Sequence, residues 1–242
     1  MSENTVYVVT GGNRGIGLGI VKELLARPST TVIATARNGV AAFEDLPVGQ
    51  GSIFHAVQLD YSKTIEAADI KKQFEAVPGF DKVHVLIANA GHASTMHDIL
   101  HTPPADLRAA TEINTIAPLT TFQALWPYMT GDVKKFVYIS SSVGSKGMME
   151  PMPGGSYGPS KAAGNWIAKA LHLQLEREGL VSMAVHPGFV KTEMGVSASE
   201  QWGVLGGPPD EVVDSARGVV GVIDRDEFGG KFVTQNGVEL DW

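Results

Sequence analysis

The 242-residue sequence has no cysteine and no Asn-x-Ser/Thr glycosylation acceptor. Nothing therefore points to an oxidising compartment. The opening residues, MSENTVYVVT, lack the basic and long apolar regions of a signal peptide. No apolar run approaches the roughly 20 residues that cross a bilayer. We expect a cytoplasmic protein that has no membrane partner.

Basic residues are also scarce. The chain has 19 Lys and Arg against 26 Asp and Glu, which gives a formal net charge of −7. This balance disfavours attraction to nucleic acid or to an anionic membrane surface, so we expect neither partner. Because the whole chain is acidic, a polyanionic ligand would need a cluster of basic residues at its own site. The hydrophobic share of 43% and the charged share of 19% are those of a globular protein.

Short apolar runs alternate with segments of helical periodicity along the whole chain. This alternation predicts a parallel sheet that helices cover on both faces. No linker-like change of composition interrupts it, so we predict a single Rossmann-type doubly wound α/β domain over residues 1–242. The predicted strands are 6–9, 30–37, 52–60, 82–91, 134–140, 180–186 and 230–234, and the predicted helices are 16–25, 62–77, 104–129, 157–178 and 210–223.

Two segments, 141–156 and 188–209, are rich in Gly, Pro and Met and are predicted to lack regular secondary structure. Each follows the carboxyl end of a predicted strand, where open parallel sheets bind their ligands. We expect both segments to wall a pocket, with 188–209 as a loop on the substrate side.

A glycine-rich turn, TGGNRGIG, directly follows the first predicted strand and opens the first predicted helix. Glycine permits a tight turn and a close approach of the backbone to a pyrophosphate, and the start of a helix favours its negative charge. Gly11, Gly15 and Gly17 therefore predict a dinucleotide site, because the strand-turn-helix context makes the motif specific.

The second predicted strand ends in Ala36-Arg37, where many dinucleotide sites place an acidic residue on the ribose. A guanidinium at this place suits a ribose 2′-phosphate, and Arg14 in the glycine turn would add a second one. We therefore predict NADP(H) rather than NAD(H). The alternative is that both arginines are ordinary surface residues.

Several ordered motifs resemble the short-chain dehydrogenase/reductase family in its short, single-domain form. TGGNRGIG resembles TGxxxGxG, Asn89-Ala90-Gly91 its NAG signature, YGPSK its YxxxK, and HPGFVKT its PG segment. Within the family the chain is most similar to norsolorinic-acid-type ketoreductases and carbonyl reductases, which share its aromatic ending, Trp242. The resemblance implies that the cofactor is bound by Gly11, Asn13, Arg14, Gly15, Ile16, Gly17, Arg37, Asp60, Tyr61, Asn89, Ala90, Gly91, Tyr157, Lys161, Pro187, Gly188, Val190 and Thr192.

The resemblance also implies four catalytic residues: Asn114, Ser141, Tyr157 and Lys161. The family usually places the serine about thirteen residues before the tyrosine, where this sequence has Gly144. Aligning ISSSVG with the usual ISSVAG assigns the role to Ser141 and implies a short insertion after it. Ser142 and Ser140 remain alternatives for the same role.

Carbonyl reduction needs a hydride at carbon and a proton at oxygen. Tyr157 would give the proton, and Lys161, one helical turn later, would favour its phenolate by positive charge. By the same resemblance Ser141 would hold the substrate oxygen and Asn114 a water that resupplies protons. Pro159, which lies between Tyr157 and Lys161, fits a helix that begins near Tyr157, since the first helical turn tolerates proline.

Other candidates are weaker. His92, His97 and His101 have no carboxylate–cysteine framework, so we predict no metal site and place them near the substrate mouth. Thr192 suits the cofactor carboxamide or a helix N-cap. A broad apolar ligand would fit flexible methionines and an aromatic ring in the irregular segments. These are Met148, Met149, Met152, Met194 and Trp202.

We thus expect an NADPH-dependent reductase of a ketone or aldehyde with a bulky apolar body, acting in secondary metabolism or carbonyl detoxification. The alternatives are a dinucleotide-binding regulator without catalysis, and a cyclase, isomerase or dehydratase on the same fold. Relatives pair subunits through helices such as 104–129 and 157–178, so a homodimer or homotetramer is also an expectation. The physiological direction of the reaction and the substrate lie beyond the sequence.

Overall fold

Seven parallel strands form one sheet in a computed structural model that describes residues 4–39, 41–132 and 134–242. The strand order, β3-β2-β1-β4-β5-β6-β7, reverses between β1 and β4, which confirms the predicted doubly wound Rossmann-type fold. The strands are β1 (Thr5–Val9), β2 (Thr30–Ala36), β3 (Ile53–Gln58), β4 (Val85–Ala88), β5 (Lys134–Ile139), β6 (Leu180–His186) and β7 (Phe232–Thr234).

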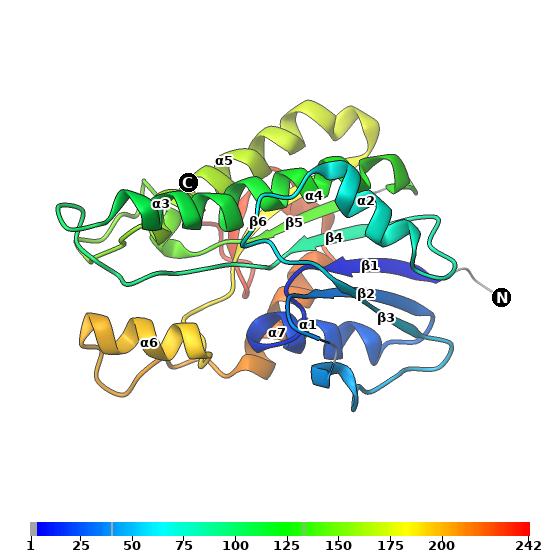
Figure 1. Cartoon of the computed structure of the whole chain (residues 1–242), viewed down its shortest axis with the longest axis horizontal. Coiled ribbons are helices and arrows are strands. Elements are labelled where there is room, and N and C mark those ends of the chain that lie inside the picture. Colours follow the sequence, from blue (N-terminus) through cyan, green and yellow to red (C-terminus); the bar gives the residue numbers. More distant parts are fainter. Residues whose placement is uncertain (1–3, 40, 133) are drawn as a thin grey trace.

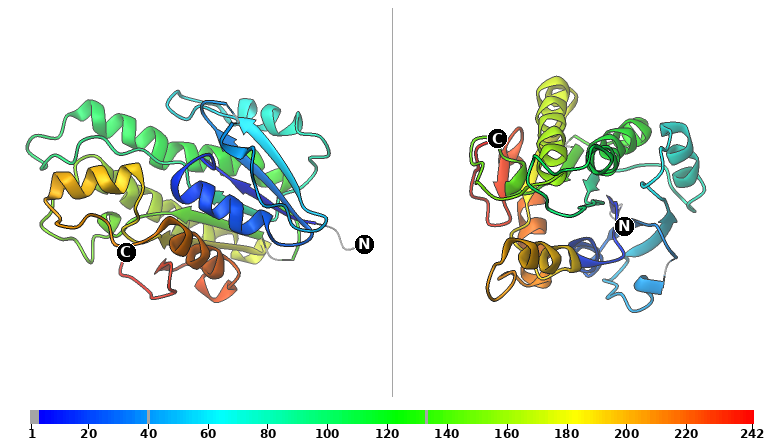
Figure 2. Two further views of the ribbon diagram at one scale, coloured as in Figure 1. Left: turned by 90° about the horizontal axis from the view of Figure 1, so that it is seen from below. Right: turned by 60° about the vertical axis from the view of Figure 1, so that its left-hand side comes forward.

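Helices cover both faces of the sheet (Figures 1 and 2). The helices α1 (Gly15–Leu25) and α7 (Val212–Ile223) pack together on one face. The other face carries α2 (Ala67–Glu75), α3 (Pro104–Thr111), α4 (Ala117–Leu125) and α5 (Tyr157–Leu175). Among the residues that the structure describes, no helix has the length and apolar character of a membrane span.

Strand residues alternate between two hydrophobic cores. In β1, Val6 and Val8 belong to the core under α2, α4 and α5, whereas Tyr7 and Val9 belong to the core under α1 and α7. A parallel strand that is buried on both faces has a nearly continuous apolar sequence, which is why the apolar runs predicted the strands.

The predicted segment 188–209 is not a loop throughout. It contains α6 (Glu193–Trp202), which lies at the carboxyl ends of the strands, on the same side of the sheet as α1 and α7 (Figures 1 and 2). The side chain of Thr192 caps this helix by accepting a hydrogen bond from the amide of Gly195 at 3.1 Å. Gly203 ends it in the left-handed region, with φ of 66°. The prediction of an irregular segment was therefore wrong over these ten residues.

The predicted helix 104–129 is also interrupted. Between α3 and α4 the backbone forms a π-helical turn, Glu112–Ile116, and a 3₁₀ turn, Trp126–Tyr128, follows α4. Such π turns shift the register of a helix and are frequent at functional sites. Asn114 lies in the middle of this one, fully buried.

The helix α5 begins at Tyr157, as the proline between Tyr157 and Lys161 predicted. Pro159 lies in the first turn of this helix. The N–H groups of a first turn have no intrahelical acceptor, so proline, which lacks an N–H, costs no hydrogen bond there. Farther along, α5 approaches β5 so closely that the ring of Tyr138 lies against Gly164. A Cβ at Gly164 would lie 2.2 Å from Cζ of Tyr138, so no larger residue fits.

This contact gives a test of the packing. Gly164→Ala should lower the free energy of unfolding by about 1–3 kcal/mol, because the clash outweighs the better helix propensity of alanine. Gly221→Ala in α7 is the matched control, since nothing lies within 4 Å of its Cβ position. The control should gain up to about 1 kcal/mol in urea denaturation. Equal gains in both variants would contradict the close approach of α5 to β5.

Candidate active site

A cleft of about 1110 Å³ opens at the carboxyl ends of the strands. It is walled by the glycine turn, the ends of β2 to β5, the start of α5, and the inner face of α6. All the predicted cofactor residues line it except Gly188 and Val190. Val190 is buried and pairs with Asp210, and Gly188 faces Asp210 and Gln235. The predicted residues that line the cleft are Gly11, Asn13, Arg14, Gly15, Ile16, Gly17, Arg37, Asp60, Tyr61, Asn89, Ala90, Gly91, Tyr157, Lys161, Pro187 and Thr192.

The glycine turn fits a pyrophosphate. Gly11 and Gly15 adopt φ of 63° and 54°, which favours glycine at both places. The helix α1 starts at Gly15 with no side-chain cap and no acidic residue in its first turn. Its first N–H groups and the positive end of its dipole therefore remain available to an anion.

Asn89 connects the glycine turn to the end of β4. Its side-chain amide donates to the carbonyls of Thr10 at 2.9 Å and Gly11 at 3.0 Å. A Cβ at Gly17 would lie 2.4 Å from the same amide nitrogen. Asn89 thus holds the turn in shape, and Gly17 is small because Asn89 occupies the adjoining space.

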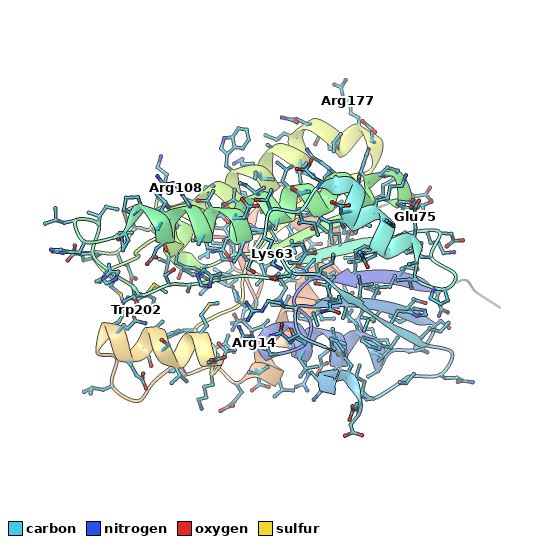
Figure 3. All side chains as sticks on the ribbon, in the orientation of Figure 1. Arg14, Lys63, Glu75, Arg108, Arg177 and Trp202 are labelled. Carbon is cyan, nitrogen blue, oxygen red and sulfur yellow. The ribbon has the colours of Figure 1, made fainter. Side chains whose placement is uncertain are left out.

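The ribose end of the cleft carries Arg37, Arg14 and Asp60. Arg37 is exposed directly after β2, and Arg14 forms an ion pair with Glu193 at the start of α6. Figure 3 labels Arg14 near the start of α1. Asp60 accepts hydrogen bonds from the amide and the hydroxyl of Ser62, which lower the pKa of its carboxyl.

Tyr157 lines the other end of the cleft, whereas Ser141 beside it does not. The hydroxyl of Ser141 lies close enough to that of Tyr157 to lower its pKa. Ser140 lines the cleft, but it is largely buried and its hydroxyl donates to Asn165. The amide of Ser142 donates to Nδ1 of His186 at 3.2 Å. Of the three serines considered, Ser141 is therefore the one whose hydroxyl lies beside Tyr157.

Residues at the end of the chain support the loop that follows Ser141. The hydroxyl of Ser145 donates to the carbonyl of Asp241 at 2.6 Å. The amides of Lys146 and Gly147 both donate to Trp242, at 3.1 and 2.9 Å. The loop beside the catalytic serine candidate is thus fixed by residues almost a hundred positions away.

Lys161 is buried one turn below Tyr157. Its ammonium donates to the carbonyl of Ile139 at 2.8 Å and lies 5.5 Å from the centre of the Tyr157 ring. Burial lowers the pKa of Lys161 to about 7 and raises the pKa of Tyr157 to about 12, although the hydrogen bond from Ser141 lowers the latter. The expected lowering of the Tyr157 pKa by Lys161 is not found, because burial dominates at both groups.

Asn114 joins three parts of the chain through its side chain. Both N–H bonds of its amide are used, by the carbonyl of His92 at 2.8 Å and the hydroxyl of Ser160 at 2.9 Å. Its side-chain oxygen accepts from the amide of His92 at 2.7 Å. The side chain thus fastens the π turn to the segment after β4 and to α5.

The substrate end differs from the prediction as well. Met194 lines the cleft, but Met148, Met149 and Met152 are exposed and do not line it. Trp202 packs on Phe189 with ring centres 5.9 Å apart and donates to the carbonyl of Pro153 at 2.8 Å. The lining side chains at this end are His92, Ser94, Met96, Met194, Ser197 and Gln201.

Sequence reasoning missed Met96, Ser197 and Gln201. Ser197 and Gln201 lie one helical turn apart on α6, so missing that helix hid them. The sequence does carry a signal for this helix, since Thr192 suits an N-cap and Gly203 follows Trp202. Met96 had no detectable signal, because it lies in a segment without periodicity, where the side chain of Gln201 accepts its amide hydrogen at 2.7 Å.

The three histidines do not assemble into a metal site. His92 contacts the Ser94 hydroxyl at 3.2 Å, and His101 pairs with Asp98 at 2.8 Å. Over residues 4–39, 41–132 and 134–242, no group of three or more His, Asp or Glu side chains is arranged to hold a metal ion. Only His92 of the three lines the cleft.

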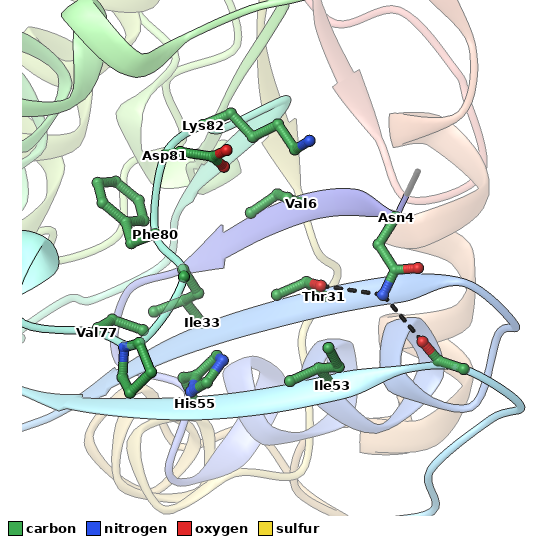
Figure 4. A pocket seen from close by; sticks show the side chains of 13 residues that line it. Asn4, Val6, Thr31, Ile33, Ile53, His55, Val77, Phe80, Asp81 and Lys82 are labelled. Carbon is green, nitrogen blue, oxygen red and sulfur yellow. Dashed lines mark hydrogen bonds between the residues drawn. The ribbon is translucent and has the colours of Figure 1, made fainter. Parts of the chain in front are cut away.

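A second hollow of about 440 Å³ lies at the amino ends of the strands, beside the segment before β4 (Figure 4). Asn4 closes one side by donating to Thr31 at 3.2 Å and to the carbonyl of Gly51 at 2.9 Å. The hollow contains none of the predicted site residues, so the larger cleft is the candidate active site.

The buried lysine gives a test that needs no substrate. The unfolded chain keeps a proton on Lys161 up to about pH 10.5, whereas the folded protein releases it near pH 7. The free energy of unfolding should therefore rise with pH between these values, by at most about 1.4 kcal/mol per pH unit from this group. Lys161→Met should remove this contribution, and urea denaturation at pH 7 to 9.5 measures it. Lys72→Met, exposed on α2, should keep the original slope; a loss of slope in both variants would refute the assignment.

Comparisons with known proteins agree with this geometry. The family model described as short chain dehydrogenase matches residues 5–202. The short-chain dehydrogenase RED3 of Pyricularia oryzae is 34% identical over 100% of both chains. Norsolorinic acid ketoreductase nor1 of Dothistroma septosporum is 32% identical over 100% of this chain and 94% of its own.

Solved structures show the same fold at full coverage of both chains. The NADPH-bound carbonyl reductase from chicken fatty liver has a TM-score of 0.82 and 27% identity. The carbonyl reductase Sniffer of D. melanogaster has a TM-score of 0.83 and 26% identity. Together with its cleft and motifs, these similarities show that the chain belongs to the short-chain dehydrogenase family of oxidoreductases.

Proposed function

We propose that the protein reduces a ketone or aldehyde to an alcohol with NADPH. The observation that carries the proposal is that Tyr157, beside Ser141 and above buried Lys161, lines the same cleft as the glycine turn. A protonated tyrosine, a second hydroxyl and an open helix start are the groups that carbonyl reduction with a dinucleotide requires.

Each residue then has a defined task. NADPH supplies the hydride to the carbonyl carbon when it is bound. Ser141 donates to the carbonyl oxygen and keeps it next to Tyr157, whose hydroxyl gives its proton to that oxygen as negative charge develops. Burial raises the pKa of Tyr157, so the hydroxyl is protonated at neutral pH and is ready to act as the donor.

Two arginines support NADPH rather than NADH. Arg14 and Arg37 both line the ribose end of the cleft, and no acidic residue follows β2 directly. A guanidinium binds a phosphate by charge and by paired hydrogen bonds. The chicken carbonyl reductase of similar fold was solved with NADPH bound.

The substrate end suits a bulky, largely apolar carbonyl compound. Met96 and Met194 provide adaptable apolar surface. Ser94 and Ser197 add hydroxyls that suit polar substituents on such a body. One relative is named a norsolorinic acid ketoreductase, which supports a ketone as the substrate.

A cyclase, isomerase or dehydratase and a dinucleotide sensor are the competing functions. Each can be separated from a reductase by one measurement, since only a reductase consumes NADPH and forms an alcohol in equal amounts. Purified protein, NADPH and a panel of aromatic and small hydrophilic carbonyls provide it. No NADPH consumption with any member would overturn the proposal, and a preference for small hydrophilic carbonyls would overturn the substrate class.

Tyr157→Phe removes the proton donor while keeping the ring. Turnover should fall by roughly 10²-fold or more, with the Kd for NADPH within about twofold, because only the proton transfer is lost. Tyr128→Phe is the control, since its hydroxyl contacts Glu75 at the far end of the molecule. A Tyr157→Phe variant with more than about a tenth of the original turnover would disprove the assigned role.

Arg37→Ala should raise the Kd for NADPH by about tenfold and leave the Kd for NADH unchanged, because only NADPH carries the 2′-phosphate. Fluorescence titration of both dinucleotides measures the difference. Arg177→Ala, at the opposite end of the molecule (Figure 3), is the matched arginine control. Equal affinity of the unaltered protein for the two dinucleotides would contradict the preference.

A further inference from the structure

Lys161 is a buried cation with no carboxylate beside it. It is 3% exposed, and none of the ion pairs in the described part of the chain includes it. A buried ammonium is costly unless other groups stabilise its charge. Lys161 therefore keeps its proton near neutral pH only as far as the groups around it stabilise the charge.

The groups that face Lys161 are neutral. Ile139 offers one carbonyl at 2.8 Å. Tyr157, on the same helix, has its ring centre at 5.5 Å, and Tyr138, from β5, has its ring centre at 4.9 Å. Asn114 in the π turn is the remaining group. Its side-chain oxygen and the ammonium of Lys161 border the same space, since both lie within 3.6 Å of a Cβ built at Gly91. Tyr138 is therefore the nearer of the two rings.

Tyr138 is held in this position from both sides. It is 1% exposed, and its hydroxyl donates to the main-chain carbonyl of Asn114 at 2.7 Å. Gly164 leaves the space that its ring occupies against α5. Tyr138 thus contacts Lys161 through its ring and the π turn through its hydroxyl.

We propose that Tyr138 is a positioning residue of the reaction, whose ring face stabilises the ammonium of Lys161 in place of a carboxylate. A carboxylate would attract the ammonium away from Tyr157 and could accept its proton, whereas an aromatic ring stabilises a cation without accepting one. The hydroxyl fixes the ring by its bond to Asn114. The inference rests on the proposed function, since the task of Lys161 beside Tyr157 comes from it.

The test separates the ring from the hydroxyl. Tyr138→Phe removes only the hydroxyl, whereas replacing Tyr138 by pentafluorophenylalanine keeps nearly the same shape but removes the negative ring face. Without that face Lys161 loses its proton at lower pH. The basic limb of the kcat/KM profile for carbonyl reduction should then move to lower pH by about one unit. In Tyr138→Phe it should stay within about 0.3 units of the original.

A second measurement needs no turnover. The pH-dependent rise in the free energy of unfolding, which Lys161 causes, should begin about one unit lower with pentafluorophenylalanine and stay in place with Tyr138→Phe. Tyr138→Met, which also lacks the ring, should behave like pentafluorophenylalanine and serves if that protein does not fold. If the unaltered protein reduces no carbonyl, the proposed function fails, and the unfolding curves still decide the role of Tyr138.

Two results would overturn the inference. The first is that neither the pH profile nor the unfolding curve moves when the ring face is removed, even if stability or kcat falls at every pH; Tyr138 is then only a packing residue. The second is an equal shift in Tyr138→Phe, which would assign the effect to the hydroxyl rather than to the ring.

Discussion

The close approach of α5 to β5 and to the turn after it determines the rest of the site. Glycines on both sides make it feasible: a Cβ at Gly144 would lie 2.7 Å from Cβ of Lys161, and a Cβ at Gly158 would lie 3.1 Å from the carbonyl of Val143. Because the helix is this close, the start of α5 places Tyr157 against Ser141 and buries Lys161 under it. The chemistry proposed for the cleft is thus a consequence of backbone packing, since larger residues at these places would separate the groups.

The two ends of the cleft use different physical means. At the glycine turn, main-chain N–H groups and exposed arginines are available to an anion. At Tyr157, burial controls both ionisable groups, and the partners are hydroxyls, carbonyls and ring faces. Asn114, through His92 and Ser160, ties the wall of the buried end to α5. This division suits a reaction that binds a charged dinucleotide but transfers a hydride away from water.

The sequence predicted the sheet, its strands and the start of α5 because those features depend on local patterns: apolar runs, a glycine turn and a proline in a first turn. It failed at α6, whose few apolar residues make a weak periodic signal although Thr192 and Gly203 mark its ends. It also failed for Lys161 and Tyr157, because spacing gives their proximity but not their burial. The positions of Tyr138, Met96 and Gln201 depend on how distant elements pack, which no local pattern contains. The exposure of Met148 and Met149 was also not predicted, because it too depends on how distant elements pack.

The contact between the last residues and the loop after Ser141 has a practical meaning. Asp241 and Trp242 accept hydrogen bonds from Ser145, Lys146 and Gly147, while the Trp242 ring packs on Phe232 with centres 5.8 Å apart. Loss of Asp241 and Trp242 would therefore detach the loop after Ser141 from the sheet, although neither residue lines the cleft.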